Sequence, residues 1–208
     1  MLFRSKLFDR NFTETSLRDN LARHRILHIA THGQFVSGNP EDSFLILGDG
    51  QKLSIPTIKT MTDLRDTHLV VLSACETGKG GADKEGIEVA GIGHYFLLNG
   101  AKSVMPSLWL VNDPATSLLM RDFYRRLPLS TSKSEALRQV QVSFITEKLT
   151  QKDIRSNAQM VDFTHPYYWA PFILIGNNQL DGWNSCRNQW HCCNEIFQAL
   201  IRPNSTKK

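Results

Sequence analysis

Short apolar segments alternate with helix-like segments along most of this chain, and this alternation limits the possible folds more than any other feature of the sequence. Residues 25–33, 67–75 and 101–111 are apolar runs of strand length. Residues 87–99 are apolar on most sides, which predicts a helix packed on a sheet face. Strands that are nearly continuously apolar, and that alternate with helices, predict an α/β fold with helices covering both faces of a mainly parallel sheet.

Capping residues predict where several helices begin. Thr13 is the expected N-cap of a helix within residues 12–23. Asp113, followed by proline, is the expected N-cap of another helix. Ser132 and Glu135 have capping-box spacing and predict the start of a third.

Three further segments complete the expected elements. Residues 43–55 are typical of a β-hairpin, because Gly48-Asp49-Gly50 separates two short apolar runs. Residues 168–176 are expected to form a last strand. Residues 177–208 change in character, and within them only residues 194–201 suggest an element, a short helix.

Composition narrows the possible functions. The chain has 208 residues, 41% of them hydrophobic, and a formal net charge of +4 that is spread rather than clustered. This pattern is typical of a globular protein and does not favour nucleic acid as a partner. The apolar runs are far shorter than the ~20 residues that span a membrane, and no secretory signal is recognisable, so we expect a cytoplasmic location without membrane association.

No cofactor or metal is expected. The Gly-Lys-Gly-Gly stretch at 78–81 lacks the Ser/Thr that follows the lysine in phosphate-binding loops, so it does not indicate nucleotide binding. Cys186, His191, Cys192 and Cys193 have the chemistry of metal ligands. Adjacent cysteines are not the usual zinc-finger spacing, and the role of these cysteines stays open.

A fourth cysteine lies in a different setting. Cys75 ends the apolar run at 67–75 and is followed by a glycine-rich segment, whereas His32-Gly33 ends the run at 25–33. Carboxyl ends of parallel strands meet at one sheet edge, where ligand sites form. If the two strands are neighbours, His32 can deprotonate the Cys75 thiol, and the N–H groups of Gly33 and Cys75 can form an oxyanion hole. The alternative is that both side chains are structural, which is what we expect of His28.

Six short stretches of the chain together resemble the CHAT domain family, a branch of the caspase-like cysteine peptidases related to separase, gingipain and metacaspases. The resemblance implies a caspase-like three-layer α/β/α sandwich with a mainly parallel sheet, His32 as general base and Cys75 as nucleophile. It thus implies a cysteine endopeptidase that acts on protein or peptide substrates. The stretches are THG (31–33), SACETG (73–78), EGI (85–87), NGAKSV (99–104), SLWLVND (107–113) and HPYYWAPFILIG (165–176).

The resemblance also implies further features. SLWLVND is similar to a separase stretch whose acids hold a basic substrate side chain, which makes Asp113 a substrate-binding candidate, although Leu110 replaces the first acid. We expect the family domain at residues 10–176, lacking N-terminal strand–helix units, and a separate tail at 177–208. The missing units would leave a sheet edge open. A helical-repeat partner or an upstream segment is the expected regulator, and a catalytically inactive interaction module or gene fragment is the alternative.

Overall fold

The computed structural model consists of two compact units, and each is described by itself. The first comprises Met1–Leu110, Ile173–Asn177 and Trp190–Lys208, and the second comprises Val111–Phe172 and Asn178–Gln189. The structure describes residues 5–21, 24–34, 36, 39–60, 64–76, 87–109, 111–147, 150–152, 160–180 and 196–200.

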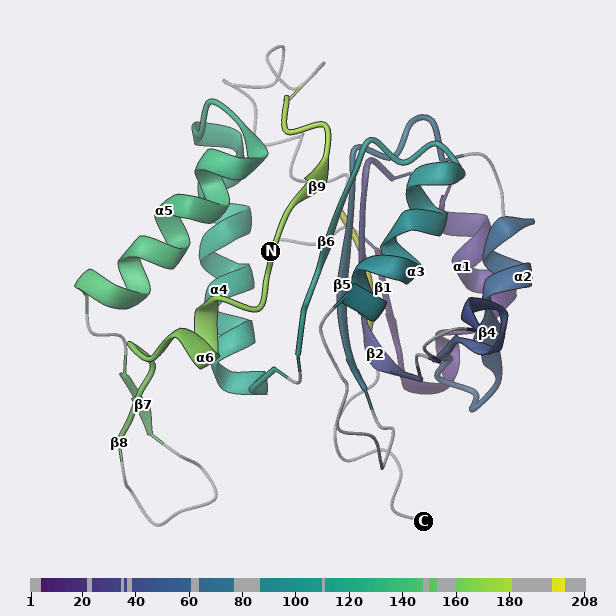
Figure 1. Cartoon of the computed structure of the whole chain (residues 1–208), viewed down its shortest axis with the longest axis horizontal. Coiled ribbons are helices and arrows are strands. Elements are labelled where there is room, and N and C mark those ends of the chain that lie inside the picture. Colours follow the sequence, from purple (N-terminus) through teal and green to yellow (C-terminus); the bar gives the residue numbers. More distant parts are fainter. Residues whose placement is uncertain are drawn as a thin grey trace. The chain divides into compact units, whose positions relative to one another are not determined.

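One sheet forms the centre of the first unit (Figure 1). Its strand order is β1-β10-β2-β5-β6-β9, and β3 pairs with β2 and with β4. Neighbours from β1 to β6 in this order are parallel, whereas β9, β3 and β4 pair antiparallel. The strands of this sheet in the described residues are β1 (Ser5–Phe8), β2 (Ile26–Gln34), β3 (Phe44–Ile46), β4 (Lys52–Ser54), β5 (Leu69–Glu76), β6 (Ser103–Pro106), β9 (Ile175–Gly176) and β10 (Ile196–Leu200).

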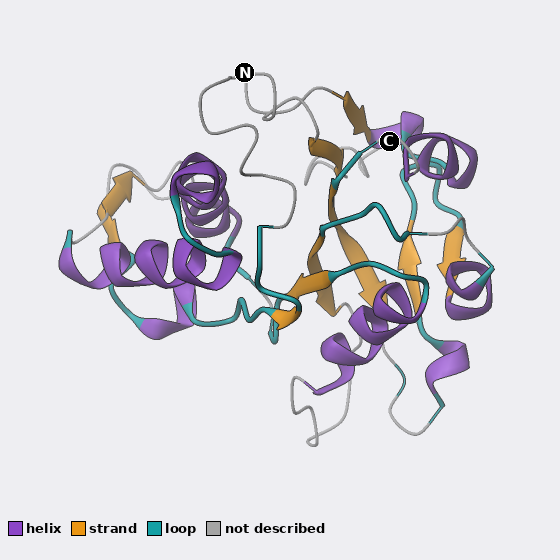
Figure 2. Cartoon of the chain, turned by 90° about the horizontal axis from the view of Figure 1, so that it is seen from above, coloured by secondary structure: helices purple, strands orange, loops and turns teal. Residues whose placement is uncertain are grey.

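Three helices of the first unit, α1 (Glu14–Leu21), α2 (Ile55–Lys59) and α3 (Ile87–Leu98), pack on one face of this sheet (Figures 1 and 2). Alternate strand residues supply the sheet side of this core because successive side chains of a strand point to opposite faces. Leu27 of β2, for example, is in register with Val70 of β5, and both are buried. Phe96 of α3 is completely buried in the same core. The predicted α/β class with a mainly parallel sheet is confirmed, and the fold is consistent with a caspase-like sandwich.

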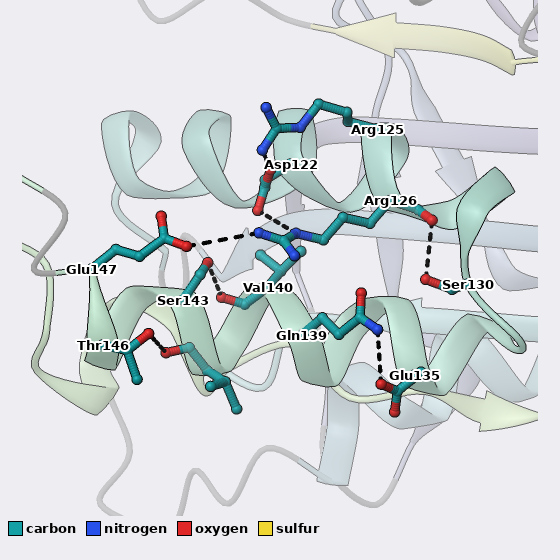
Figure 3. A network of polar contacts seen from close by, with 11 residues as sticks. Asp122, Arg125, Arg126, Ser130, Glu135, Gln139, Val140, Ser143, Thr146 and Glu147 are labelled. Atoms are coloured by element: carbon teal, nitrogen blue, oxygen red, sulfur yellow. Dashed lines mark hydrogen bonds and ion pairs between the residues drawn. The ribbon is translucent and has the colours of Figure 1, made fainter.

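The second unit is mainly helical. Its helices are α4 (Asp113–Arg126), α5 (Lys133–Thr146) and α6 (Pro166–Trp169), and β7 (Thr150–Lys152) and β8 (Met160–Asp162) form an antiparallel hairpin. Phe123 of α4 and Phe144 of α5 are both completely buried. Figure 3 shows polar contacts of α4 and α5, in which the guanidinium of Arg126 donates to Asp122 over 2.7 Å and lies 3.9 Å from the carboxylate of Glu147.

Short 3-10 turns connect several of these elements. They are η1 (Asp9–Asn11), η2 (Pro40–Asp42) and η3 (Leu127–Leu129). The predicted hairpin at 43–55 is confirmed by antiparallel pairing of β3 with β4. Gly50 in its turn has a φ of 86°, a conformation that residues with a Cβ rarely adopt.

Two of the three predicted helix caps are confirmed and one is wrong. The Thr13 hydroxyl accepts from the Ser16 N–H over 3.2 Å, and the Ser132 hydroxyl accepts from the Glu135 N–H over 3.1 Å. The N-cap of α4 is Asn112, whose side-chain oxygen accepts from the Ala115 N–H over 3.1 Å. Asp113 is therefore the first helical residue, one position after the cap.

Both predictions for the end of the chain need correction. Most of the strand expected at 168–176 is not a strand: α6 occupies its start, and strand β9 comprises Ile175–Gly176, which pairs antiparallel with β6. The short helix expected at 194–201 is instead strand β10. Tertiary pairing overrides local preference here, because β10 gains neighbours on both sides from β1 and β2.

Candidate functional site

The two strands that carry the candidate dyad are neighbours, as the site prediction required. β2 and β5 pair in parallel over eight positions, from Ile26↔Leu69 to Gly33↔Glu76, and His32 is in register with Cys75. Neighbouring strands lie about 4.8 Å apart, and residues in register lie on the same face of the sheet. The imidazole-bearing and thiol-bearing positions therefore adjoin at the carboxyl end of both strands. His32 is exposed and the following Gly33 is buried.

A second polar pair lies on the same sheet face, nearer the middle of the strands. His28 is buried, and its Nε2 lies 3.2 Å from the Ser73 hydroxyl. Burial lowers the pKa of His28 from 6.5 to about 4, so this imidazole is neutral near pH 7. The sequence predicted a structural His28 but not its contact with Ser73. The signal that could have revealed it is a serine inside an apolar strand, since buried hydroxyl groups need a partner.

The end of β2 is held on both sides. Gly33 is in register with Glu76 of β5 and, on the other edge, with Leu45 of β3. The Thr31 hydroxyl donates a hydrogen bond to the carbonyl oxygen of Ile46. The backbone at His32 is therefore held by β5 on one edge of β2. On the other edge it is held by β3, whose last residue is Ile46.

Asp113, the substrate-binding candidate, belongs to the second unit. It is exposed at the first turn of α4. An acid in the first turn interacts favourably with the partial positive charge at a helix N-terminus. That interaction explains an aspartate at this position even if Asp113 binds no substrate. The substrate-binding role of Asp113 stays a prediction.

Several residues weighed in the sequence have no description in the structure. Cys186, His191, Cys192 and Cys193 lie outside the described residues, and so does the glycine-rich segment that follows Cys75. Of Cys75 itself the structure describes the backbone. In the described part of the chain, no three His, Cys, Asp or Glu side chains cluster as metal ligands would.

No described helix is both long enough and apolar enough to cross a membrane.

Comparison with known proteins points to one family. The family model for the CHAT domain matches residues 2–177. Tetratricopeptide repeat protein 28 of Mus musculus is 31% identical over 127 residues, which is 59% of this chain. The Homo sapiens protein of the same name is 27% identical over 156 residues, or 74% of this chain. The chain spans 4% and 5% of the length of these two relatives, so the similarity concerns a small part of each.

Proposed function

Because the chain belongs to the CHAT domain family, we propose that it is a cysteine endopeptidase in which His32 and Cys75 form the catalytic dyad. The observation that carries the proposal is the register of β2 with β5, which pairs these two residues directly at the carboxyl end of adjacent parallel strands. A thiol needs a base within reach to become a nucleophile, and a neighbouring imidazole is the usual one.

The proposed reaction proceeds through a thioester. His32 accepts the Cys75 thiol proton, and the thiolate attacks the carbonyl carbon of the scissile peptide bond. The tetrahedral intermediate carries its negative charge on oxygen, where the N–H groups of Gly33 and Cys75 stabilise it. The protonated His32 then gives its proton to the leaving amine. Water, deprotonated by His32, hydrolyses the thioester and regenerates the thiol.

Three observations support this assignment of roles. His32 is exposed although most of β2 is buried, so its ring is open to a substrate. Gly33 has no side chain to stand between the backbone and a substrate carbonyl. His28, the other histidine of β2, is buried and held neutral, which leaves His32 as the histidine of this strand suited to proton transfer.

The substrate class follows as a further part of the proposal. We take the substrate to be a protein or peptide, and Asp113 to bind a basic side chain beside the scissile bond, by resemblance to the separase stretch. A carboxylate forms charge-assisted hydrogen bonds with Arg or Lys, which gives such a preference its physical basis. Asp113→Asn should reduce the preference for a basic P1 residue in a positional-scanning peptide library and leave the cleavage of other sequences unchanged.

An activity-based probe tests the dyad directly. An acyloxymethyl ketone alkylates an activated thiol, so the wild-type chain should be labelled and Cys75→Ala should not. His32→Ala should slow labelling by about 100-fold or more, in line with the loss of a general base. His94→Ala is the matched control, because His94 is an exposed histidine of α3, and its labelling should equal that of the wild type. Labelling that persists in Cys75→Ala would refute the proposal.

A proposal for how this domain is regulated comes from the names of the two relatives. Both are named for tetratricopeptide repeats, so we propose that a helical-repeat segment or partner controls this domain. A folded chain that the probe never labels, but that binds a helical-repeat protein equally well with and without Cys75→Ala, would support the alternative of an inactive interaction module.

A further inference from the structure

Strand β10 occupies an unusual place in the sheet. It lies between β1 and β2 and pairs in parallel with both, from Ser5↔Phe197 to Phe8↔Leu200 on one side and from Ile196↔Ile26 to Leu200↔Ala30 on the other. Among the described strands, β1 pairs with β10 and with no other. Removing β10 would leave a slot bordered by the backbone N–H and C=O groups of two strands.

The segment that fills this slot comes from outside the family domain. The family match ends at residue 177, whereas β10 consists of Ile196–Leu200. The other strands of the sheet lie within the matched region. The slot is therefore formed by family-domain strands and filled by a segment that the family domain does not include.

The connection to β10 is long. Leu180 and Ile196 are separated by residues 181–195, which is 15 residues. A chain of that length reaches up to about 50 Å when extended. The covalent link therefore does not restrict β10 to the slot of its own molecule.

Strand pairing depends on backbone groups and register, so it is the same whichever molecule supplies the strand. Exchange of an identical segment between two copies forms the same contacts and is a low-cost route to association. We propose that the slot between β1 and β2 is a strand-acceptor site that binds residues 196–200 of a second copy of this chain. The proposal concerns strand binding and does not depend on peptidase activity.

Occupancy of the slot reaches close to the candidate site. β10 pairs with β2 as far as Ala30, two residues before His32. Three residues further along β2, Gly33 pairs with Leu45 of β3. A strand supplied by another copy would therefore pair with β2, the strand that carries His32.

A labelled peptide of residues 194–202 (NEIFQALIR) tests the acceptor site in the full-length chain. Gln198→Pro weakens the chain's own strand, because proline removes a ladder N–H in the middle of β10. This variant should bind the peptide at least about tenfold more tightly than the wild type, whose tethered strand competes at a high effective concentration. The same peptide with proline in place of Gln198 is the control and should bind at least about tenfold more weakly. Equal binding of both peptides, or no binding to a folded Gln198→Pro chain, would overturn the proposal.

A second experiment avoids the risk that Gln198→Pro does not fold. A site-specific protease sequence is inserted after Leu180, and the full-length chain is cut only after folding. The fragment containing residues 196–208 should remain bound and then exchange with excess labelled peptide. A fragment that never exchanges, or that is lost without the peptide replacing it, contradicts a site that accepts strands from another molecule.

The donor is tested by mixing two full-length chains. Tagged Gln198→Pro should capture untagged wild-type chain, and the labelled peptide should release it. Peptide binding without capture of the wild type would reject the second copy as donor.

Discussion

Because His28 is buried, we predict that the free energy of unfolding depends on pH. The structure gives the direction and the size of this dependence. Its imidazole lies on the sheet face that carries Ser73, and in the described strands its register neighbours are Val71 and Gln198, neither of which is charged. Burial disfavours the charged imidazolium, which is why the pKa falls from 6.5 to about 4. The folded protein therefore resists protonation that the unfolded chain accepts.

The magnitude follows from proton linkage. Below pH 6.5 the unfolded chain binds a proton at this histidine, whereas the folded chain binds it only near pH 4. The contribution of His28 to the free energy of unfolding is thus complete above pH 6.5 and is lost as the pH falls toward 4. The full loss is about 3 kcal/mol, and about 2 kcal/mol of it is reached at about pH 5.

Urea unfolding of wild type and His28→Gln at about pH 7.5 and about pH 5 measures this contribution. Glutamine keeps a polar group for Ser73 but does not titrate. Acidic groups elsewhere affect both proteins equally, so their effect cancels in the comparison. We expect the wild type to lose about 2 kcal/mol more than His28→Gln between the two conditions. If both proteins lose the same free energy within about 0.5 kcal/mol, the assigned pKa of His28 is wrong.

Further predictions concern stability and use urea unfolding at neutral pH. Ser132→Ala removes the N-cap of α5 and should cost about 1 kcal/mol. Asn112→Ala should likewise cost about 1 kcal/mol, whereas Asp113→Ala should cost no more than about 0.5 kcal/mol, because Asn112 and not Asp113 caps α4; equal costs would contradict this cap. Gly48→Ala should cost at least about 2 kcal/mol, because a Cβ there would lie 1.5 Å from the Asp9 carbonyl oxygen. Gly50→Ala, with a φ of 86° but open space around it, should cost about 1 kcal/mol, and the reverse order would refute the placement of Gly48.

The sequence alone determined the α/β class and the position of the candidate dyad along the chain. Apolar runs of strand length separated by helices have few stable arrangements other than a covered, mainly parallel sheet. Caps such as Thr13 and Ser132 could be predicted from the sequence because capping depends on residues three positions apart.

Which strands are neighbours is known only from the tertiary structure. That β2 lies beside β5, with His32 in register with Cys75, depends on contacts between segments far apart in the chain. The strand conformation of Ile196–Leu200 likewise depends on the tertiary structure, since this short segment pairs with β1 and β2 on either side. Local sequence preferences are weak compared with the backbone pairing that a sheet offers on both edges of a strand, and that is why the end of this chain could not be predicted from its residues.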